Sequence, residues 1–305
     1  MSGPRSAAGV VIDEVGFIGR REPRWRRFAG AAGRFSVASP LNAVASLLVL
    51  LVAGAAILGP LLAPHPPDVM SLTERLQAPS AAHPFGTDDF GRDLLSRVLA
   101  GARISIQVAL IVLSLSVALG TLLGAVAGLA GGMVDEVIMR VTDLFLAFPV
   151  LILAAAIAAT LGGNLTTTMI ALAAVYWPWY ARLVRGQVLS LREREYVLAA
   201  RTFGAAPWWL IRVHLLPNVL PLVIVQVSLD VGYVILATSS LSFLGLGAQP
   251  PTPEWGAMLT DARAYIRDSW WFATFPGLAL AITVFAFNLL GDGLRDWLDP
   301  RLRGR

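Results

Sequence analysis

The stretch from Tyr196 to Asn218 reads YVLAARTFGAAPWWLIRVHLLPN and separates two long apolar segments. A turn of apolar residues ends at Gly204, a second helical turn can begin at Pro207, and Pro217 precedes the next apolar run. Glycine and proline are the strongest local interrupters of regular structure. The stretch, called the connector below, therefore predicts a short helix, a bend and another short helix held at a membrane surface.

The composition of the whole chain is that of a polytopic membrane protein. Of the 305 residues, 56% are hydrophobic and only 14% are charged, whereas soluble domains have about 25% charged residues. The mean hydropathy is +0.67. The absence of Cys excludes disulfides, thiolate metal ligands and thiol catalysis, and we expect no catalytic residue and no metal ligand in this chain.

All 24 basic residues are Arg, because the chain contains no Lys. A P-loop needs a Lys to contact the phosphates of ATP. Any ATP hydrolysis coupled to this protein must therefore occur on another chain, and we expect no cofactor bound here. The net charge of +4 is explained by Arg residues near the apolar segments, which act as orientation signals, so no nucleic acid partner is expected.

Long uncharged runs predict an all-α fold with six transmembrane helices. The first run, residues 41–63, is long enough to cross a hydrocarbon core of about 30 Å. The second, residues 104–134, carries Gly120, Gly124 and Gly128 on one face of the predicted helix, where glycines allow another helix to approach closely.

The run over residues 144–181 is too long for one crossing. The Gly-Gly-Asn sequence at residues 162–164 supplies a turn, which predicts a third and a fourth span joined by a tight hairpin. The fifth predicted span begins near Val219 and ends at about Gly247, and the sixth occupies residues 269–291.

Most Arg residues fall on one side of these six spans, which predicts that both termini and the connector are cytoplasmic. The resulting division of the chain is a cytoplasmic basic tail over 1–40, a first transmembrane helix over 41–63, an external loop over 64–103, a transmembrane core over 104–297 with the connector region at about 190–217, and a cytoplasmic tail over 298–305.

The connector resembles the EAA loop of ABC importer permeases. That pattern is Glu-Ala-Ala, three residues, Gly, and then a stretch that ends in Leu-Pro before the next span. The matching residues here are Ala199, Ala200, Gly204, Leu216 and Pro217. Leu198 stands where the family usually has Glu, which removes one polar contact and leaves the rest of the pattern intact.

Three further segments resemble the second, C-type permease subunit of the dipeptide, oligopeptide and nickel group. These are GTDDFGRD at residues 86–93 followed by LSR at 95–97, PPTPEWG at 250–256, and GDGLRD at 291–296. The resemblance covers residue 41 to the end of the chain, and it implies the ABC importer permease fold in a bacterial or archaeal cytoplasmic membrane.

The resemblance also implies the partners. A second homologous permease subunit completes the pathway across the lipid bilayer, two cytoplasmic P-loop ATPase subunits or domains bind ATP and Mg²⁺, and an external binding protein delivers the substrate. In the family, the EAA loop includes a coupling helix that lies in a groove on the ATPase. The coupling residues implied here are Tyr196, Val197, Leu198, Ala199, Ala200, Arg201, Phe203, Gly204, Leu216 and Pro217.

Charged residues at membrane depth are candidates for function. Asp230 is the carboxylate that lies within a predicted span, with Gln226 one turn before it. A role in the substrate path or gate and a role in hydrogen bonding between helices both fit this position. Glu254 and Trp255, in the predicted external loop before the last span, are candidates for an outer gate or for contact with the binding protein.

The sequence leaves the substrate open. Peptides are the largest substrate class of the resembled family, and nickel or another small polar solute is the alternative. His65 and His83 lie in the predicted external loop, but two isolated His residues do not support metal delivery. Rival functions are a self-sufficient secondary transporter or channel, which would need more membrane carboxylates, and a purely structural membrane subunit.

Overall fold

The structure, a computed structural model, describes residues 35–36 and 39–298. The predicted cytoplasmic tails therefore lie almost entirely outside the described residues, together with their Arg side chains. Within the described part every regular element is a helix, and the one β-bridge joins Thr87 to Asp93. The predicted all-α class is confirmed.

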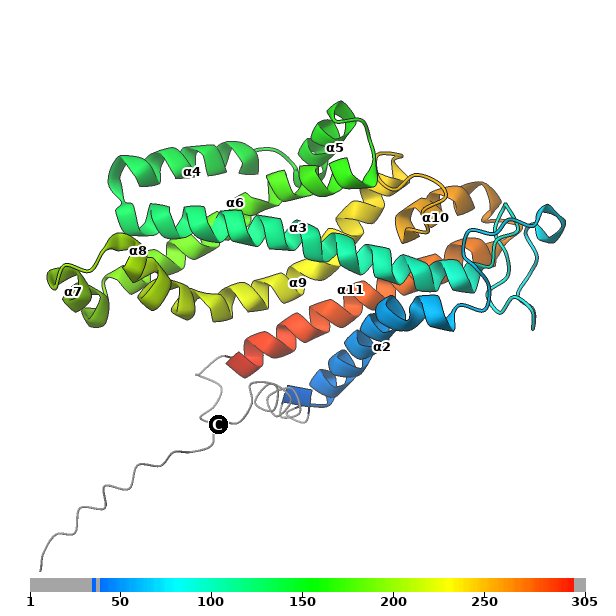
Figure 1. Cartoon of the computed structure of the whole chain (residues 1–305), viewed down its shortest axis with the longest axis horizontal. Coiled ribbons are helices and arrows are strands. Elements are labelled where there is room, and N and C mark those ends of the chain that lie inside the picture. The colour runs from blue at the N-terminus through cyan, green and yellow to red at the C-terminus, as the bar shows by residue number, and fades with distance from the viewer. Residues whose placement is uncertain (1–34, 37–38, 299–305) are drawn as a thin grey trace, which may run out of the picture. The chain divides into compact units, whose positions relative to one another are not determined.

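The elements follow one another as shown in Figure 1. The helices are α2 (Pro40–Leu62), η1 (Leu72–Glu74), α3 (Leu94–Ala130), α4 (Gly132–Leu146), α5 (Val150–Thr160), α6 (Leu165–Arg192), α7 (Glu195–Thr202), α8 (Pro207–Leu210), the π-helix η2 (Ile211–Leu215), α9 (Leu216–Phe243), α10 (Trp255–Ala262), η3 (Arg263–Tyr265) and α11 (Trp270–Leu298).

Helix α3 is central to the bundle, because it packs against α2, α6, α9 and α11. Its 37 residues correspond to about 55 Å at 1.5 Å per residue, which exceeds the hydrocarbon thickness of about 30 Å. The segment over residues 63–93, called the loop segment below, lies at the N-terminal end of α3, and α7 and α8 lie at the other end (Figure 1).

The close approach of α3 to α6 depends on the three glycines on one face of α3. A Cβ atom on Gly120 would lie 2.4 Å from the carbonyl oxygen of Trp177, and one on Gly124 would lie 2.3 Å from that of Ala181. Real Cβ atoms are not found at such distances, so only glycine permits this contact. The predicted role of this glycine face is confirmed.

The predicted turn at residues 162–164, in the middle of the third apolar run, is also confirmed. Gly162 and Gly163 have φ values of +102° and +53°, which glycine adopts without the steric cost that a side chain adds. Asn164 caps α6 by accepting a hydrogen bond of 3.0 Å from the Thr167 amide, and the Thr167 hydroxyl accepts one of 2.9 Å from the Asn164 amide. This capping box fixes where α6 begins.

The expected third span has a different form. Instead of one straight helix before the hairpin, α4 and α5 are separated by a short break and bent by 89°. Pro149 lies at that break, and proline disfavours helical geometry in the residue before it. Helix α5 has 11 residues, about 17 Å, and is too short to cross a membrane alone.

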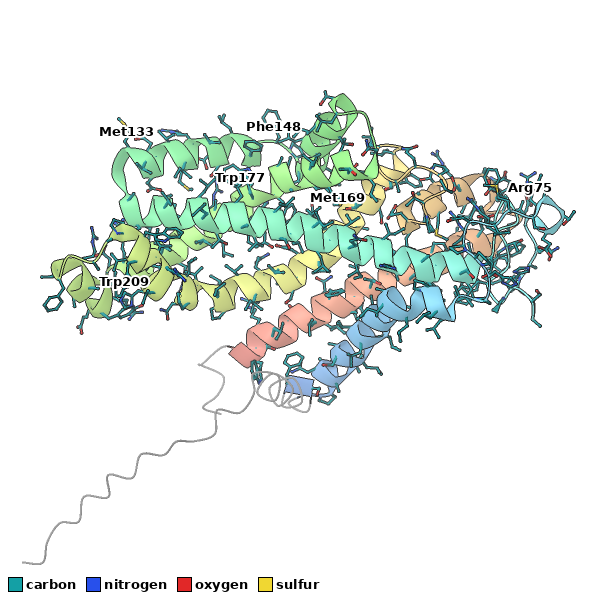
Figure 2. All side chains as sticks on the ribbon, in the orientation of Figure 1. Arg75, Met133, Phe148, Met169, Trp177 and Trp209 are labelled. Atoms are coloured by element: carbon teal, nitrogen blue, oxygen red, sulfur yellow. The ribbon has the colours of Figure 1, made fainter. Side chains whose placement is uncertain are left out.

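Four helices of the described part are long and apolar enough to span a membrane: α2, α3, the continuous stretch from α8 to α9, and α11. The bent pair of α4 and α5 would raise this number to five. The six-span count and the orientation of the termini stay predictions. Exposed apolar side chains such as Met133 and Phe148 cover the outer surface of the bent pair, as expected for a surface that faces lipid or another subunit (Figure 2).

Candidate functional site

The connector forms two helices separated by a sharp turn. Helix α7 ends in a Schellman motif, in which the Gly204 amide donates 2.9 Å to the Arg201 carbonyl and the Ala205 amide donates 3.0 Å to the Ala200 carbonyl. Gly204 has a φ of +81°, as this motif requires at its glycine position. The structure thus forms the helix, bend and helix that the sequence predicts.

The predicted coupling residues do not share one surface. Val197 is fully buried in the bundle, whereas Phe203 is 91% exposed. The exposed members of the set are Tyr196, Leu198, Ala199, Arg201, Phe203, Gly204 and Pro217, while Ala200 and Leu216 are half-buried. Val197 therefore attaches the connector to its own chain, and Phe203 leaves a large apolar ring open to contact.

A cleft of about 460 Å³ separates the connector from the C-terminal end of α3. One wall consists of Arg201, Ala205 and Trp208, and the other includes Leu129 and Ala130. The cleft is lined mainly by apolar side chains, with Arg201 as its charged member. It is suited to an apolar side chain from another protein that carries a neighbouring carboxylate.

An ion pair and a side-chain hydrogen bond hold the helices next to the connector. Arg185 of α6 makes a bidentate contact with Asp135 of α4, at 2.5 Å and 2.6 Å. Arg192, the last residue of α6, donates 3.0 Å to the carbonyl oxygen of Gly128 in α3. The interpretation of these Arg residues as orientation charges does not include either contact, because the partners lie 50 or more residues away in the chain.

Asp230 lies near the midpoint of α9 and is 8% exposed. Its Oδ2 accepts a hydrogen bond of 2.6 Å from the Tyr180 hydroxyl of α6, and its Oδ1 accepts one of 3.0 Å from Gln226 Nε2. The ring of Tyr233, one turn later, lies 5.5 Å from that of Tyr176. The predicted bond between helices is thus present, and it places a carboxylate within a group of three tyrosines.

Glu254 and Trp255 are both buried, at 1% and 2% exposure. Glu254 caps α10 by accepting from the Ala257 amide at 3.0 Å, and it accepts a second bond of 2.9 Å from the Ser239 hydroxyl of α9. The Trp255 indole donates 3.0 Å to the carbonyl oxygen of Val98 in α3. In this conformation neither side chain is exposed enough to contact a binding protein. Together they join α3, α9 and α10.

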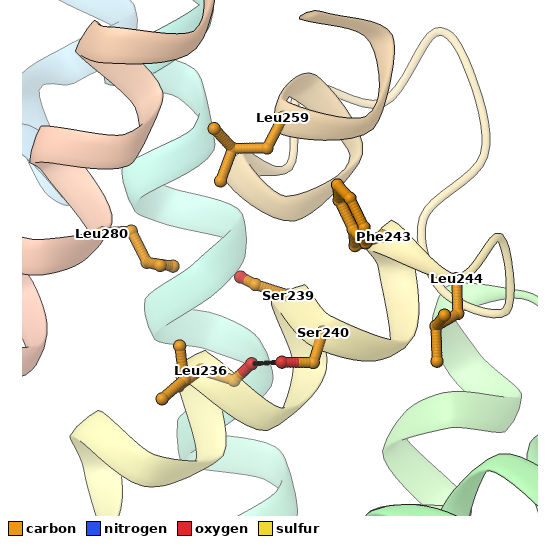
Figure 3. Close-up of a pocket in the computed structure, with 7 residues that line it drawn as sticks. All are labelled: Leu236, Ser239, Ser240, Phe243, Leu244, Leu259 and Leu280. Atoms are coloured by element: carbon orange, nitrogen blue, oxygen red, sulfur yellow. Dashed lines mark hydrogen bonds between the residues drawn. The ribbon is translucent and has the colours of Figure 1, made fainter. Parts of the chain in front are cut away.

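An apolar hollow of about 310 Å³ lies beside this junction. Figure 3 shows that its side chains come from α9 and the residue after it, from α10 and from α11, with Leu259 and Leu280 facing Ser239. Ser240 donates to the carbonyl oxygen of Leu236, so its hydroxyl is already satisfied. The hollow therefore offers mainly hydrophobic contact.

The loop segment contains a buried ionic network that sequence reasoning missed. Asp88 is fully buried, accepts 2.6 Å from Arg92 Nε and lies 3.3 Å from Arg97 Nε. Arg92 and Arg97 are only 1% and 2% exposed. Two Arg residues of the predicted external loop, Arg92 and Arg97, are therefore structural partners of a carboxylate. The alternating charges within GTDDFGRD are the feature of the sequence that could have indicated this network.

A family model described as binding-protein-dependent transport system inner membrane component matches residues 120–304, which include the connector and the last span. The chain belongs to this family. Its relatives are permeases of ABC importers, and this permease is accordingly a multi-pass inner membrane protein.

Relatives match the permease over most of its length. It is 48% identical over 286 residues, 93% of this chain and 96% of the relative, to the probable D,D-dipeptide transport system permease protein DdpC of Escherichia coli (strain K12). It is 47% identical to the dipeptide transport system permease protein DppC of Alkalihalophilus pseudofirmus, over 81% of this chain and 82% of that one. It is 45% identical to the nickel transport system permease protein NikC of Escherichia coli (strain K12), over 85% and 94%.

Proposed function

We propose that this permease forms half of the translocation pathway of a binding-protein-dependent importer of di- or oligopeptides. ATP hydrolysis on partner subunits drives transport, and the chain itself catalyses no reaction. The peptide assignment rests on the dipeptide transport relatives that align over most of the chain. We assign coupling to the ATPase to the connector, because it presents exposed apolar residues beside a cleft at one end of the bundle.

The connector is the proposed docking element for an ATPase subunit. Phe203 is the exposed apolar contact, and Arg201 at the cleft pairs with a carboxylate of the partner. Leu198, where the family usually has Glu, is 42% exposed and adds apolar contact at that place. Docking in this importer therefore depends more on shape and apolar burial than on the charge that the family pattern supplies.

The link from the connector to the pathway runs through the helices that follow it. Val197 is buried against the bundle, and the connector continues through η2 into α9, which carries Asp230. A displacement of the connector by the ATPase would therefore act on α9 directly. We assign Gln226 and Asp230 to the pathway or its gate, and Glu254 and Trp255 to the junction that holds the opposite end of α9.

The remaining partners are a second homologous permease and an external binding protein. The exposed apolar residues of α4 and α5 supply a surface that lipid or a sister subunit can cover. The loop segment, at the far end of α3 from the connector, is the proposed side for the binding protein.

The test is reconstitution of this permease with its sister permease, ATPase and binding protein in liposomes. We expect uptake of a labelled dipeptide that requires both ATP and the binding protein. Uptake without ATP would indicate a secondary transporter or channel and would overturn the coupling assignment.

Nickel is the second candidate substrate, because the nickel permease relative is 45% identical, close to the value for the dipeptide relative. Mass spectrometry of the ligand that co-purifies with the binding protein separates the two. A peptide ligand supports the proposal, and bound nickel without peptide contradicts the peptide assignment while leaving the ATP-coupled mechanism intact.

A further inference from the structure

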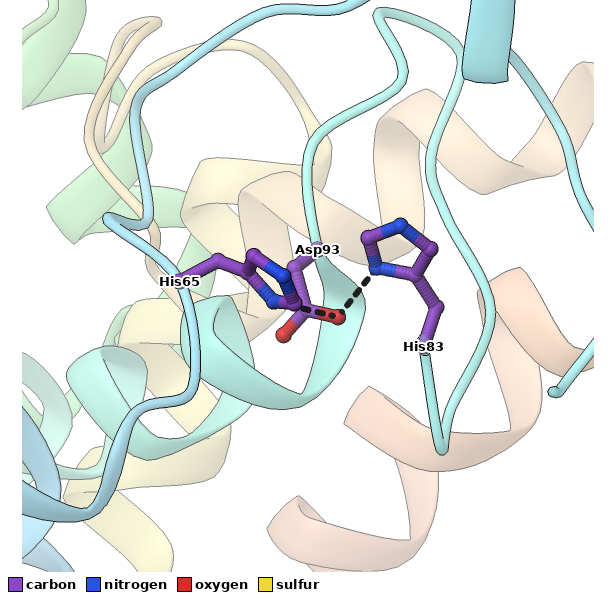
Figure 4. A group of neighbouring side chains, drawn as sticks. All are labelled: His65, His83 and Asp93. Atoms are coloured by element: carbon purple, nitrogen blue, oxygen red, sulfur yellow. Dashed lines mark hydrogen bonds and ion pairs between the residues drawn. The ribbon is translucent and has the colours of Figure 1, made fainter. Parts of the chain in front are cut away.

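Three side chains with metal-ligand chemistry meet in the loop segment. His65 follows the end of α2, His83 lies in the middle of the segment, and Asp93 is the N-cap residue of α3. Figure 4 shows the two imidazole rings on either side of the Asp93 carboxylate. One ligand atom from each residue lies within 4.8 Å of the others. The two His residues, isolated in sequence, are therefore neighbours in the fold.

The separations between the ligand atoms suit a small divalent cation. His83 Nδ1 lies 2.8 Å from Asp93 Oδ1, and His65 Nδ1 lies 3.7 Å from the same oxygen. Ligand atoms at about 2.0–2.2 Å from a tetrahedral Zn²⁺ are about 3.4 Å apart. The two observed distances lie on either side of that value, so small side-chain adjustments bring the three atoms to coordination geometry.

His65 Nδ1 is a polar atom without a partner. The His65 side chain is 43% exposed, yet its Nδ1 is buried, makes no hydrogen bond and lies on the side of Asp93. A buried polar atom without a partner is unfavourable, and native structures usually satisfy such atoms with protein, water or an ion. A cation between His65 and Asp93 would satisfy it.

Contacts outside the three ligands hold them in place. Asp93 Oδ2 accepts from the Ser96 amide at 2.8 Å and from the Ser96 hydroxyl at 2.7 Å, which leaves Oδ1 to face the two imidazoles. The Ser96 hydroxyl oxygen also accepts from the His65 amide at 3.1 Å. One serine therefore positions two of the three ligands.

The remaining ligand has its own support. His83 Nε2 lies 4.0 Å from Glu74 Oε2, on the opposite edge of the ring from Nδ1. A metal-bound His commonly directs its other nitrogen to a carboxylate, which fixes the tautomer and the ring orientation. Glu74 lies near that position, 0.5 Å beyond the hydrogen-bond limit of 3.5 Å, for a metal bound through His83 Nδ1.

We propose that His65, His83 and Asp93 bind one late first-row divalent metal ion, such as Zn²⁺ or Ni²⁺. Two imidazoles and one carboxylate match this class, whereas Ca²⁺ and Mg²⁺ prefer oxygen ligands. Water completes the coordination. The bound ion joins the residues that follow α2 to the N-cap residue of α3, so it stabilises the loop segment whatever solute the importer carries.

The experiment uses the full chain, purified in detergent with an affinity tag that contains no histidine. The protein is stripped with a chelator, desalted and titrated with Zn²⁺ or Ni²⁺ alone, and the bound metal and the melting temperature are measured. We expect one ion per chain and a melting temperature that rises with free metal, because a ligand that binds the folded state stabilises it.

His65→Gln is the diagnostic variant, because the His65 side chain is half-exposed and makes no side-chain hydrogen bond that the fold needs. We expect it to keep the size-exclusion profile of the wild type and to bind the metal at least about ten-fold more weakly. His214→Gln, which replaces the remaining His of the chain outside this cluster, is the matched control and should bind as the wild type does.

Wild-type binding by His65→Gln, or no binding by the wild type, would overturn the proposal. If His65→Gln loses its fold, X-ray absorption of the metal-loaded wild type decides the question. Scattering from two imidazole ligands supports the site, and a spectrum without imidazole scattering contradicts it.

Discussion

The Tyr180 hydroxyl donates a hydrogen bond of 2.6 Å to Asp230 Oδ2, near the midpoints of α6 and α9. Tyr180 is fully buried and Asp230 is 8% exposed, so this contact joins two membrane helices through a carboxylate within the bundle. Gln226 occupies the other carboxylate oxygen. These hydrogen bonds stabilise the packing of α6 against α9. Substitutions can separate this packing role of Asp230 from its proposed role in the pathway.

Asp230→Asn tests the pathway role. The Asn side chain keeps an oxygen that accepts from Tyr180, so we expect insertion and assembly to be retained, while the loss of the carboxylate lowers ATP-dependent uptake at least about ten-fold. Tyr180→Phe is the paired variant, which leaves Asp230 Oδ2 without this donor and should cost about 1–3 kcal/mol of stability. Uptake and thermal unfolding are measured for both variants. Normal uptake by Asp230→Asn would contradict the pathway role and leave Asp230 with a role in packing only.

Substitution of Gly204 tests the connector without a steric clash inside the permease, although any side chain is strained at its φ of +81°. A Cβ atom at this position meets nothing within 4 Å, so a substitution creates no clash inside the permease. Asn tolerates the left-handed conformation better than other residues with side chains. We therefore expect Gly204→Asn to keep most uptake and Gly204→Glu to abolish it, because a charged side chain is added to the surface proposed to dock on the ATPase.

Uptake in reconstituted liposomes and the amount of permease in the membrane are measured for both Gly204 variants. Equal membrane amounts with uptake lost only in Gly204→Glu support coupling through the connector. Normal uptake by Gly204→Glu would refute the proposed docking surface, and it would favour a purely structural subunit.

Local features of the fold were predictable from the sequence. The hairpin at residues 162–164 follows from backbone preferences of Gly and Asn, and the close approach at Gly120 and Gly124 follows from spacing along one helix. Both depend on residues near one another in the chain. The same holds for the bend at Gly204.

Features that depend on distant partners were not predictable in this way. Asp88 has charged neighbours within GTDDFGRD, but only the fold shows that its carboxylate is fully buried between Arg92 and Arg97. Likewise, His65 and His83 have no metal-ligand spacing, and only the fold of the loop segment brings both to Asp93. The burial of Glu254 was missed because its Ser239 partner lies on another helix.

The packing of α3 against α6 gives a stability prediction with an internal control. In Gly124→Ala the added methyl group would lie 2.3 Å from the Ala181 carbonyl oxygen, so the helices must separate, and we expect a loss of about 1–3 kcal/mol. Gly54→Ala makes the same chemical change in α2, where nothing lies within 4 Å. It should be neutral or stabilising by up to about 1 kcal/mol.

Thermal unfolding in detergent compares the two glycine variants with the wild type. A melting temperature of Gly124→Ala equal to that of Gly54→Ala would contradict the close helix contact.

The half-buried Asp89 carboxyl group of the loop segment predicts how stability depends on pH. Burial, together with the negative charges of Asp88 and Asp261, raises the pKa of Asp89 above its ordinary value of 3.8. Over the interval from that value up to the raised pKa, the folded protein binds more protons than the unfolded chain. The free energy of unfolding therefore falls as the pH rises through this interval.

Asp89→Asn removes this titration, because the amide stays neutral. We expect the variant to lose less stability than the wild type as the pH rises from 3.8 towards neutral pH, because the amide does not ionise in the folded protein. Asp268→Asn removes the same charge from an exposed position and is the control for the loss of one negative charge. Melting temperatures measured across this range test the prediction. Parallel profiles for Asp89→Asn and the wild type would contradict it, because they would show that the Asp89 carboxyl is ionised at the same pH in the folded and unfolded chains.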